Sequence, residues 1–138
     1  MSEYRVVKTE FRDRECLKKA LDDVAKELGI RYAQGENLTL YGYMGDARPE
    51  TAEFVIRRRY LDTLSNDLGY RWNPEKGIFE EIVSEYDQRV RRVTMIRNKV
   101  RQRYAYHKVL QEARRKGMAV QAVEQKGGVI HITLRALR

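Results

Sequence analysis

Residues 68–86 read LGYRWNPEKGIFEEIVSEY, and this stretch decides the fold class. Apolar or aromatic residues recur at every second position from Leu68 to Trp72, which is typical of a β-strand. The NPEKG segment at 73–77 has proline at its second position and closes with glycine, as a tight turn does. Residues 78–86 then predict the return strand. The stretch is therefore a β-hairpin, and it makes the neighbouring strands antiparallel.

More strands are expected on both sides of this hairpin. Their signals are β-branched and aromatic residues with a period of two. A loop at 44–51 and a polar connection at 61–67 separate some of them, and Gly42–Gly45 is interpreted as a turn. The strands are expected at 4–11, 30–33, 38–43, 52–57, 118–124 and 129–137. Gly127 and Gly128 join the last two as a second hairpin, and the alternation in 129–137 indicates one buried face.

Two helices complete the pattern. Asp13 is a plausible N-cap, and an apolar stripe with helical spacing runs from Leu17 to Leu28 before Gly29 ends the helix. Residues 94–116 contain no glycine or proline and predict a long second helix. Its N-terminal half is basic nearly all round, so we expect that half to protrude or to face a partner, and its C-terminal half to pack.

The predicted order is β-α-β-β-β-β-β-α-β-β. Few helices and short links between strands indicate an α+β fold, with a mostly antiparallel twisted sheet and two helices on one face. The chain shows no repeat and no linker, so we expect a single domain over residues 1–138.

Composition excludes several classes of protein. Cys16 is the only cysteine, so the chain is not a disulfide scaffold and has no thiolate metal site. No apolar run approaches the roughly 20 residues that a membrane-spanning helix needs. The first residues lead directly into a patterned segment and not into a signal peptide. We therefore expect a cytoplasmic protein, in the host cytoplasm if a phage encodes it.

The positive charge is concentrated in one segment. The chain carries a net charge of +8, with 28 basic and 20 acidic residues. Residues 89–116 hold eleven of the basic residues and one acid, a local charge of +10, and the other 110 residues sum to −2. Arginine outnumbers lysine 19 to 9, which suits bidentate contacts to phosphate or carboxylate groups. The segment indicates an anionic partner, although a thermophilic or GC-rich source accounts for the arginine content equally well.

Several segments together resemble a known family. They are FRDRECLKKAL (11–21), AEFVIR (52–57), LGYRWN (68–73) and QRYAYHKVLQEA (102–113), the last followed by Gly117. In this order they resemble an uncharacterised family of short proteins known as a conserved reading frame of cyanobacteria and algal plastids, with relatives in bacteria and phages. The resemblance covers nearly the whole chain and implies no activity. Members of the family are suspected of working beside larger machines.

Motifs for catalysis and cofactor binding are missing. The chain has no phosphate loop, no dinucleotide-binding signature, and only two histidines, His107 and His131. Neither histidine has a second histidine or a carboxylate at helical spacing, and Cys16 lies next to a core-facing stripe. We therefore expect no enzyme activity, no cofactor and no metal ion.

One acidic cluster keeps a remote alternative open. Glu80, Glu81, Glu85 and Asp87 lie on one predicted strand and its exit, and the last three share a face by parity. Such a face could hold a catalytic metal in a metal-dependent hydrolase. A solvated acidic face, or pairing with the basic helix, explains it more simply.

The basic segment is the strongest functional signal. Its arginines and lysine could neutralise phosphates, and its tyrosines could stack on bases or pack on the domain. The candidate binding residues are Arg89, Arg91, Arg92, Arg97, Lys99, Arg101, Arg103 and Tyr104, with a second cluster at Arg57, Arg58 and Arg59. They favour a non-enzymatic accessory protein that binds nucleic acid or a nucleoprotein machine, such as transcription machinery, through the second helix. The alternative is a protein adaptor or regulator of a larger ATPase or polymerase complex that makes no nucleic-acid contact.

Overall fold

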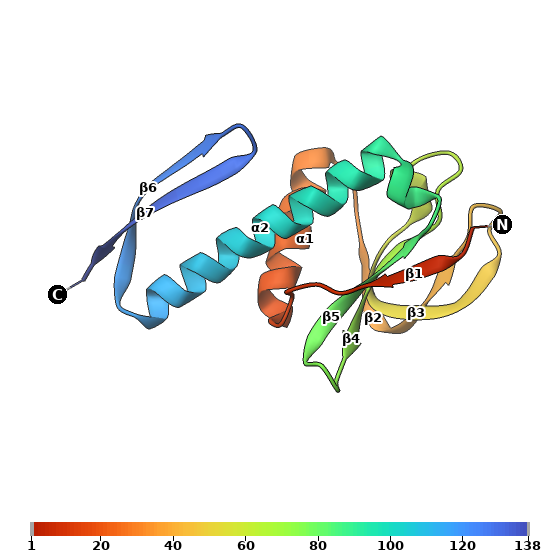
Figure 1. Cartoon of the computed structure of the whole chain (residues 1–138), viewed down its shortest axis with the longest axis horizontal. Coiled ribbons are helices and arrows are strands. Elements are labelled where there is room, and N and C mark those ends of the chain that lie inside the picture. Colours follow the sequence, from red (N-terminus) through yellow and green to blue (C-terminus); the bar gives the residue numbers. More distant parts are fainter. Residues whose placement is uncertain (1, 138) are drawn as a thin grey trace.

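The structure is a computed structural model that describes residues 2–137 (Figure 1). Within these residues, two α-helices, seven strands and two single-turn 3₁₀ helices follow one another. They are β1 (Tyr4–Val7), α1 (Arg14–Leu28), β2 (Ala33–Tyr41), β3 (Ala47–Ile56), η1 (Arg58–Tyr60), β4 (Leu68–Asn73), β5 (Ile78–Ser84), η2 (Asp87–Arg89), α2 (Arg91–Arg115), β6 (Met118–Lys126) and β7 (Val129–Ala136).

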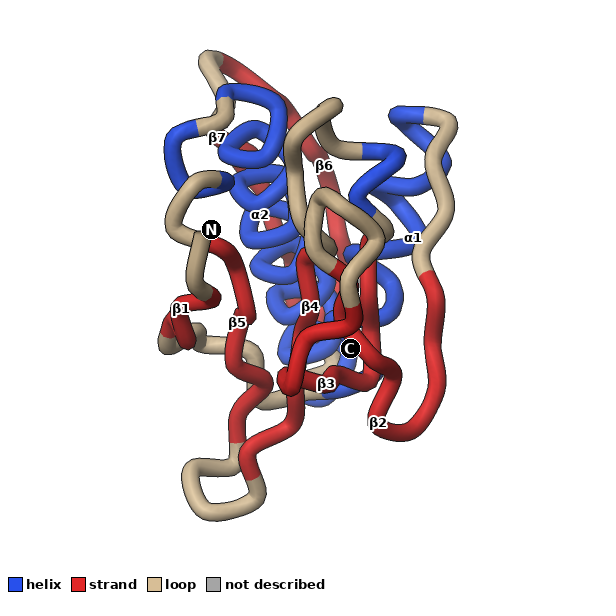
Figure 2. The backbone as a smooth tube through the Cα atoms, turned by 90° about the vertical axis from the view of Figure 1, so that its right-hand side faces the viewer, coloured by secondary structure: helices blue, strands red, loops and turns tan. Residues whose placement is uncertain are grey.

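Five of the strands form one antiparallel sheet in the order β1-β5-β4-β3-β2. The hairpin predicted at 68–86 is β4 and β5, and it supplies the middle of the sheet next to β3. In Figure 2 the two helices lie behind the strands of this sheet. The predicted α+β fold class, with its helices on one face, is confirmed. The strands expected at 30–33 and 38–43 run together as β2, which has an irregular register between Gln34 and Leu38.

Helix α1 follows its sequence signals closely. Asp13 is the N-cap, and its Oδ1 accepts a hydrogen bond of 2.9 Å from Cys16 N. Gly29 ends the helix in the left-handed conformation with φ 65°, where a side chain would be strained. The apolar stripe is buried against the sheet, and it consists of Cys16, Leu17, Ala20, Leu21 and Val24.

Helix α2 packs in the opposite way from our expectation. Its N-terminal half is the buried half: Val93, Ile96, Val100 and Tyr104 lie in the main core. The C-terminal half extends past the sheet (Figure 1) and keeps Val109 39% exposed. The expectation was wrong because these four apolar residues, at spacings of three, four and four, form a narrow stripe within a basic sequence.

The sheet curls at β3 (Figure 1), and a smaller core of Leu40, Ala52, Val55 and Ile82 lies apart from the main one. Leu40 of β2 and Ala52 of β3 reach across β4 at Gly69. A Cβ atom on Gly69 would lie 2.9 Å from Ala52 Cβ and 3.1 Å from a Leu40 methyl group, so only glycine fits there. At the start of β3, the Arg48 guanidinium donates to the Ser2 carbonyl at 2.9 Å, which holds the N-terminal segment against the curl.

The connection between η1 and β4 ends in a segment that is polar but buried. Ser65, Asn66 and Asp67 are almost completely enclosed. Asp67 Oδ2 accepts from Tyr41 N and from Arg57 Nη1, both at 2.8 Å, and Oδ1 accepts from Arg58 N at 2.7 Å. One carboxylate therefore ties the connection to the end of β2 and to the start of η1.

The last two strands do not join the main sheet. β6 and β7 form a separate two-stranded sheet that leaves the far end of α2 and folds back beside it, so that the Gly128 carbonyl in its turn accepts from the Gln102 side chain (Figure 1). The alternation predicted in 129–137 is present, but its apolar face is only half-buried, and none of its residues belongs to either core. The two strands pair with each other, which accounts for the alternating pattern. Helix α2 covers too little of their apolar face to bury it.

Removing the hairpin is therefore expected to leave the domain folded. A chain that ends at Gly117 keeps both cores intact, so its free energy of unfolding should fall by less than about 1 kcal/mol. Urea unfolding followed by circular dichroism measures this. As a control, a chain that ends at Gln102 also loses Tyr104 and should not unfold cooperatively. Loss of the cooperative transition in the chain ending at Gly117 would show that the hairpin is part of the core.

Candidate functional site

Several of the predicted binding residues are buried in the structure or paired with carboxylates. Arg97 is buried, and its Nε and Nη2 atoms lie 2.8 and 2.7 Å from Glu81 Oε1 on β5. Arg101 Nη2 approaches the same oxygen at 3.4 Å. The Tyr70 hydroxyl donates to Glu81 Oε2 at 2.8 Å. Arg97 therefore neutralises a buried carboxylate and is not available to a phosphate.

Tyr70 stays a hydrogen-bond donor in this network. Burial raises the pKa of its hydroxyl well above the usual value, and the negative charge of Glu81 raises it further. The phenol therefore remains protonated and holds the second carboxylate oxygen of Glu81.

Two further basic residues of α2 pair with α1. Lys99 Nζ lies 2.6 Å from Glu27, and Arg103 Nε lies 2.8 Å from Asp23 Oδ2. His107 Nε2 reaches the same Asp23 oxygen at 2.6 Å. Burial alone would raise the pKa of Asp23, but the hydrogen bonds from His107 and Arg103 outweigh it and hold that pKa below its usual range. These side chains fasten the two helices to each other.

Tyr104 is a core residue. Its ring is 5% exposed and packs on Phe11 with 4.6 Å between the centroids. Its hydroxyl accepts hydrogen bonds from Arg12 N and Asp13 N, both at 3.0 Å. Of the two roles considered for this tyrosine, packing on the domain is the one that the structure shows, because no face of the ring is open to a base.

The two basic clusters of the sequence meet at one place. Arg92, in the first turn of α2, donates from Nε to the Tyr60 carbonyl of η1 at 2.9 Å. Arg59 lies over the Tyr60 ring, with its guanidinium carbon 4.9 Å from the centroid. Although Arg57 itself pairs with Asp67, the arginines that follow it are thereby placed beside the N-terminal end of α2. The sequence could not show this meeting, since Arg92 and Tyr60 are 32 residues apart along the chain.

We call the arginines of η1, of η2 and of the first turn of α2 the basic patch. Four of them are exposed and Arg58 is half-buried. Within residues 2–137 none of the five forms an ion pair with a carboxylate, in contrast to Arg97, Lys99 and Arg103. The basic patch consists of Arg58, Arg59, Arg89, Arg91 and Arg92.

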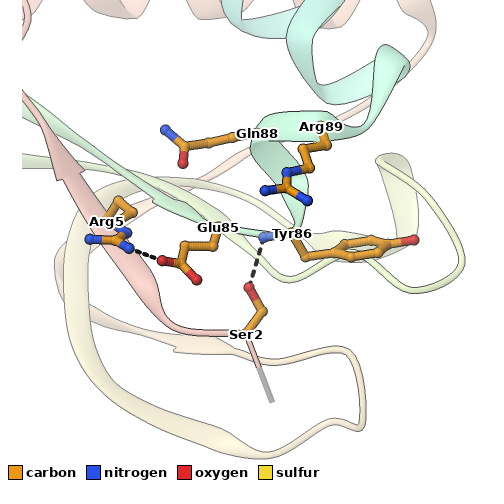
Figure 3. Close-up of a pocket in the computed structure, with 6 residues that line it drawn as sticks. All are labelled: Ser2, Arg5, Glu85, Tyr86, Gln88 and Arg89. Atoms are coloured by element: carbon orange, nitrogen blue, oxygen red, sulfur yellow. Dashed lines mark hydrogen bonds and ion pairs between the residues drawn. The ribbon is translucent and has the colours of Figure 1, made fainter.

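A hollow of about 550 Å³ opens beside the basic patch (Figure 3). Arg89 forms part of its wall, and Ser2, Arg5, Glu85, Tyr86 and Gln88 form the rest. Arg5 and Glu85 make an ion pair across it, and Ser2 Oγ accepts from Tyr86 N at 2.8 Å. Sequence reasoning missed Tyr60 and Tyr86; their position directly beside the arginine clusters was the available signal.

The acidic residues of the hydrolase alternative are not brought together. Glu81 faces the helices, Glu85 pairs with Arg5 at the surface, and Asp87 lies in a buried polar cluster where its Oδ2 accepts from Asn66 N at 2.9 Å. Glu80 lies 3.6 Å from Arg71. Burial raises the pKa of Asp87 against the opposing effect of its hydrogen bonds. Among residues 2–137 there is no group of three His, Cys, Asp or Glu side chains that could hold a metal ion.

Cys16 and His107 do come close, which the sequence did not predict. Both line a hollow of about 60 Å³ between the two helices. Burial, followed by the charge of Asp13, raises the pKa of Cys16 to about 11, so its sulfur is a thiol at neutral pH. His107 Nε2 is engaged by Asp23. The pair lacks the low-pKa thiolate that nucleophilic catalysis needs.

Comparison with known proteins identifies the family. Residues 24–133 match the family described as "Protein of unknown function (DUF1257)", and the chain belongs to this family. The chain is also 29% identical over 141 residues to a protein of Guillardia theta described as "Uncharacterized protein ycf35", and the alignment covers 100% of this chain and 99% of that relative. No solved structure gives a significant match.

These matches confirm the resemblance inferred from the sequence segments. Neither printed description names an activity, a ligand or a partner. No helix within residues 2–137 combines the length and the apolar composition that crossing a membrane requires.

Proposed function

We propose that this protein is a non-enzymatic accessory protein that binds the phosphate backbone of nucleic acid, alone or within a nucleoprotein machine such as transcription machinery, through the basic patch. The observation that carries the proposal is the difference in pairing along α2. Arg97, Lys99 and Arg103 each have a carboxylate partner within 3 Å, whereas the arginines of the patch have none within residues 2–137. An external anion would supply the missing partner.

The position of the patch on its helix supports the same proposal. The N-terminal end of a helix carries a partial positive charge, and acidic residues normally stabilise it. The first turn of α2 contains no acidic residue, and Val90 at the N-cap makes no side-chain hydrogen bond. Arg91 and Arg92 add positive charge at the same point, which opposes helix stability by a few tenths of a kcal/mol. A bound phosphate would reverse this unfavourable effect.

Replacing four patch arginines should weaken binding strongly. In the variant Arg59→Gln, Arg89→Gln, Arg91→Gln, Arg92→Gln we expect the Kd for a fluorescein-labelled 20-nucleotide strand to rise about 100-fold, since each exposed contact contributes up to roughly 0.7 kcal/mol. The dependence of log K on log salt should also flatten by about 0.7 for each lost phosphate contact. Fluorescence anisotropy at several salt concentrations measures both quantities.

The other end of α2 provides a matched control. Substituting glutamine for Lys108, Arg114, Arg115 and Lys116 removes the same charge from the C-terminal end of the helix, far from η1. That variant should lose only the modest affinity that follows from the lower net charge. Equal losses in the two variants, or retained binding in the patch variant, would refute a site at the patch.

A protein adaptor is the second candidate, and the hairpin β6–β7 favours it. Val120 and Val123 are 40% and 47% exposed on the half-buried apolar face of that hairpin. Exposed apolar side chains of this kind can contact another protein. A pull-down with the tagged full chain, with and without nuclease, separates the two candidates. A protein partner that survives digestion supports the adaptor, and loss of every partner supports nucleic-acid binding.

A further inference from the structure

Tyr86 stands between two hollows of the surface. The hollow of about 550 Å³ that contains Arg89 lies on one side, and a second hollow of about 400 Å³ lies on the other. Tyr86 and Ser2 line both. Figure 3 shows the Tyr86 side chain extending away from the backbone, and the residue is 41% exposed. Its ring therefore offers open surface next to the basic patch.

The composition of the two hollows suits a nucleobase next to a phosphate. On the patch side, Arg5 cancels the charge of Glu85 through their ion pair, which leaves the Arg89 guanidinium as the uncompensated charge of that hollow. On the other side, Leu64 is 51% exposed and contributes apolar surface. Both volumes lie within the roughly 300–1,000 Å³ of small-ligand sites.

The backbone holds Tyr86 firmly in this position. Its amide donates to Ser2 Oγ at 2.8 Å, and its carbonyl accepts from Arg89 N at 3.1 Å. The next residue, Asp87, is buried and its amide donates to Ser84 Oγ. An aromatic ring that is exposed but anchored on a rigid turn loses little conformational entropy when a flat ligand stacks on it.

We propose that Tyr86 and Arg89 form a subsite for an unpaired base and its phosphate, so that the protein prefers single-stranded nucleic acid. This inference rests on the proposed function and names its substrate class. A base in a duplex has both faces covered by its neighbours, whereas an unpaired base can stack on an exposed aromatic ring. Arg91 and Arg92, which follow on the chain, then contact the neighbouring phosphates.

The test compares strands with a duplex. Fluorescein-labelled dT20 and U20 represent the DNA and RNA sources of the same chemistry, and a 20-base-pair duplex is the competitor. Stacking of one base contributes about 1–3 kcal/mol, so Tyr86→Ala should raise the Kd for at least one single strand by roughly 5- to 150-fold. It should leave the Kd for the duplex within twofold. Tyr86→Phe keeps the ring and should retain single-strand affinity.

Tyr106 provides a matched control, because it is a tyrosine next to an arginine but away from the two hollows: the Arg103 guanidinium carbon lies 4.2 Å from its ring centroid. Tyr106→Ala should not change the Kd for the strands. Should Tyr86→Ala fold poorly, photo-crosslinking of the unaltered protein to a 5-iodouracil strand gives an independent readout, with an adduct expected on Tyr86. Adducts elsewhere only, or equal losses for strand and duplex, would overturn the subsite while leaving patch binding intact. No binding of strand or duplex would overturn both proposals.

Discussion

The variant Glu81→Ala is expected to lose about 3–5 kcal/mol of its free energy of unfolding. Glu81 is fully buried, and it is the partner of Arg97 and the acceptor for the Tyr70 hydroxyl. Removing the carboxylate leaves a buried guanidinium without its counter-charge and a buried hydroxyl without its acceptor. Both losses are larger than the net contribution of an ordinary hydrogen bond. Urea unfolding at pH 7 measures the change.

Two comparisons isolate the buried ion pair. Glu85→Ala removes a carboxylate just beyond the same strand, where the pair with Arg5 is largely exposed, and should cost less than about 1 kcal/mol. The double variant Glu81→Leu, Arg97→Leu removes both charges and should be more stable than Glu81→Ala, since no unpaired charge remains. A loss below 1 kcal/mol in Glu81→Ala would mean that Arg97 finds water or another partner when Glu81 is absent.

We expect Asp67→Ala to be destabilising by a similar amount, about 3–5 kcal/mol. Its buried carboxylate accepts from Tyr41 N, Arg58 N and Arg57 Nη1, so the substitution removes the acceptor of two backbone amides and the counter-charge of Arg57. Thermal and urea unfolding check the value. Asp62→Ala, at an exposed position of the same connection, should change the stability by less than about 0.5 kcal/mol.

Asp67 also links stability to the proposed binding surface. It holds the start of η1 in place. That short helix carries Arg59 and the Tyr60 carbonyl, which accepts a hydrogen bond from Arg92. Asp67→Asn keeps one oxygen acceptor and should lose less stability than Asp67→Ala. Should the loop change shape in that variant, nucleic-acid binding would weaken even under conditions where the domain stays folded. Unchanged stability in both Asp67 variants would show that the connection does not depend on this carboxylate.

Much of the fold could be predicted because local signals and tertiary packing agree. Asp13 and Gly29 mark the two ends of α1, as their capping chemistry predicts. The NPEKG turn closes the hairpin of β4 and β5. The second helix was harder. Its buried stripe lies among arginines. The sequence does not distinguish a buried Arg97 from a solvated one, because only the fold places Glu81 opposite it.

The candidate site was predictable only in part. A concentration of positive charge around 89–103 is a property of the sequence, but Arg97, Lys99 and Arg103 turn out to fasten α2 to the sheet and to α1. The contact between Arg92 and Tyr60, which joins the two clusters, depends on the polar connection that Asp67 organises. Tyr104 was considered for stacking, whereas the exposed ring beside the patch belongs to Tyr86.

By itself the sequence determined the α+β class, the order of the elements, the ends of α1, the central hairpin and the excess of positive charge. Each depends on residues that are neighbours along the chain: turn residues, caps, alternating faces and a local count of charges. The tertiary structure alone decided which half of α2 is buried, which basic residues are neutralised by Glu81, Asp23 and Glu27, and which have no carboxylate partner within residues 2–137. Those outcomes depend on carboxylates far away in the sequence, and the free energy of a charge depends on what the fold places within a few ångströms of it.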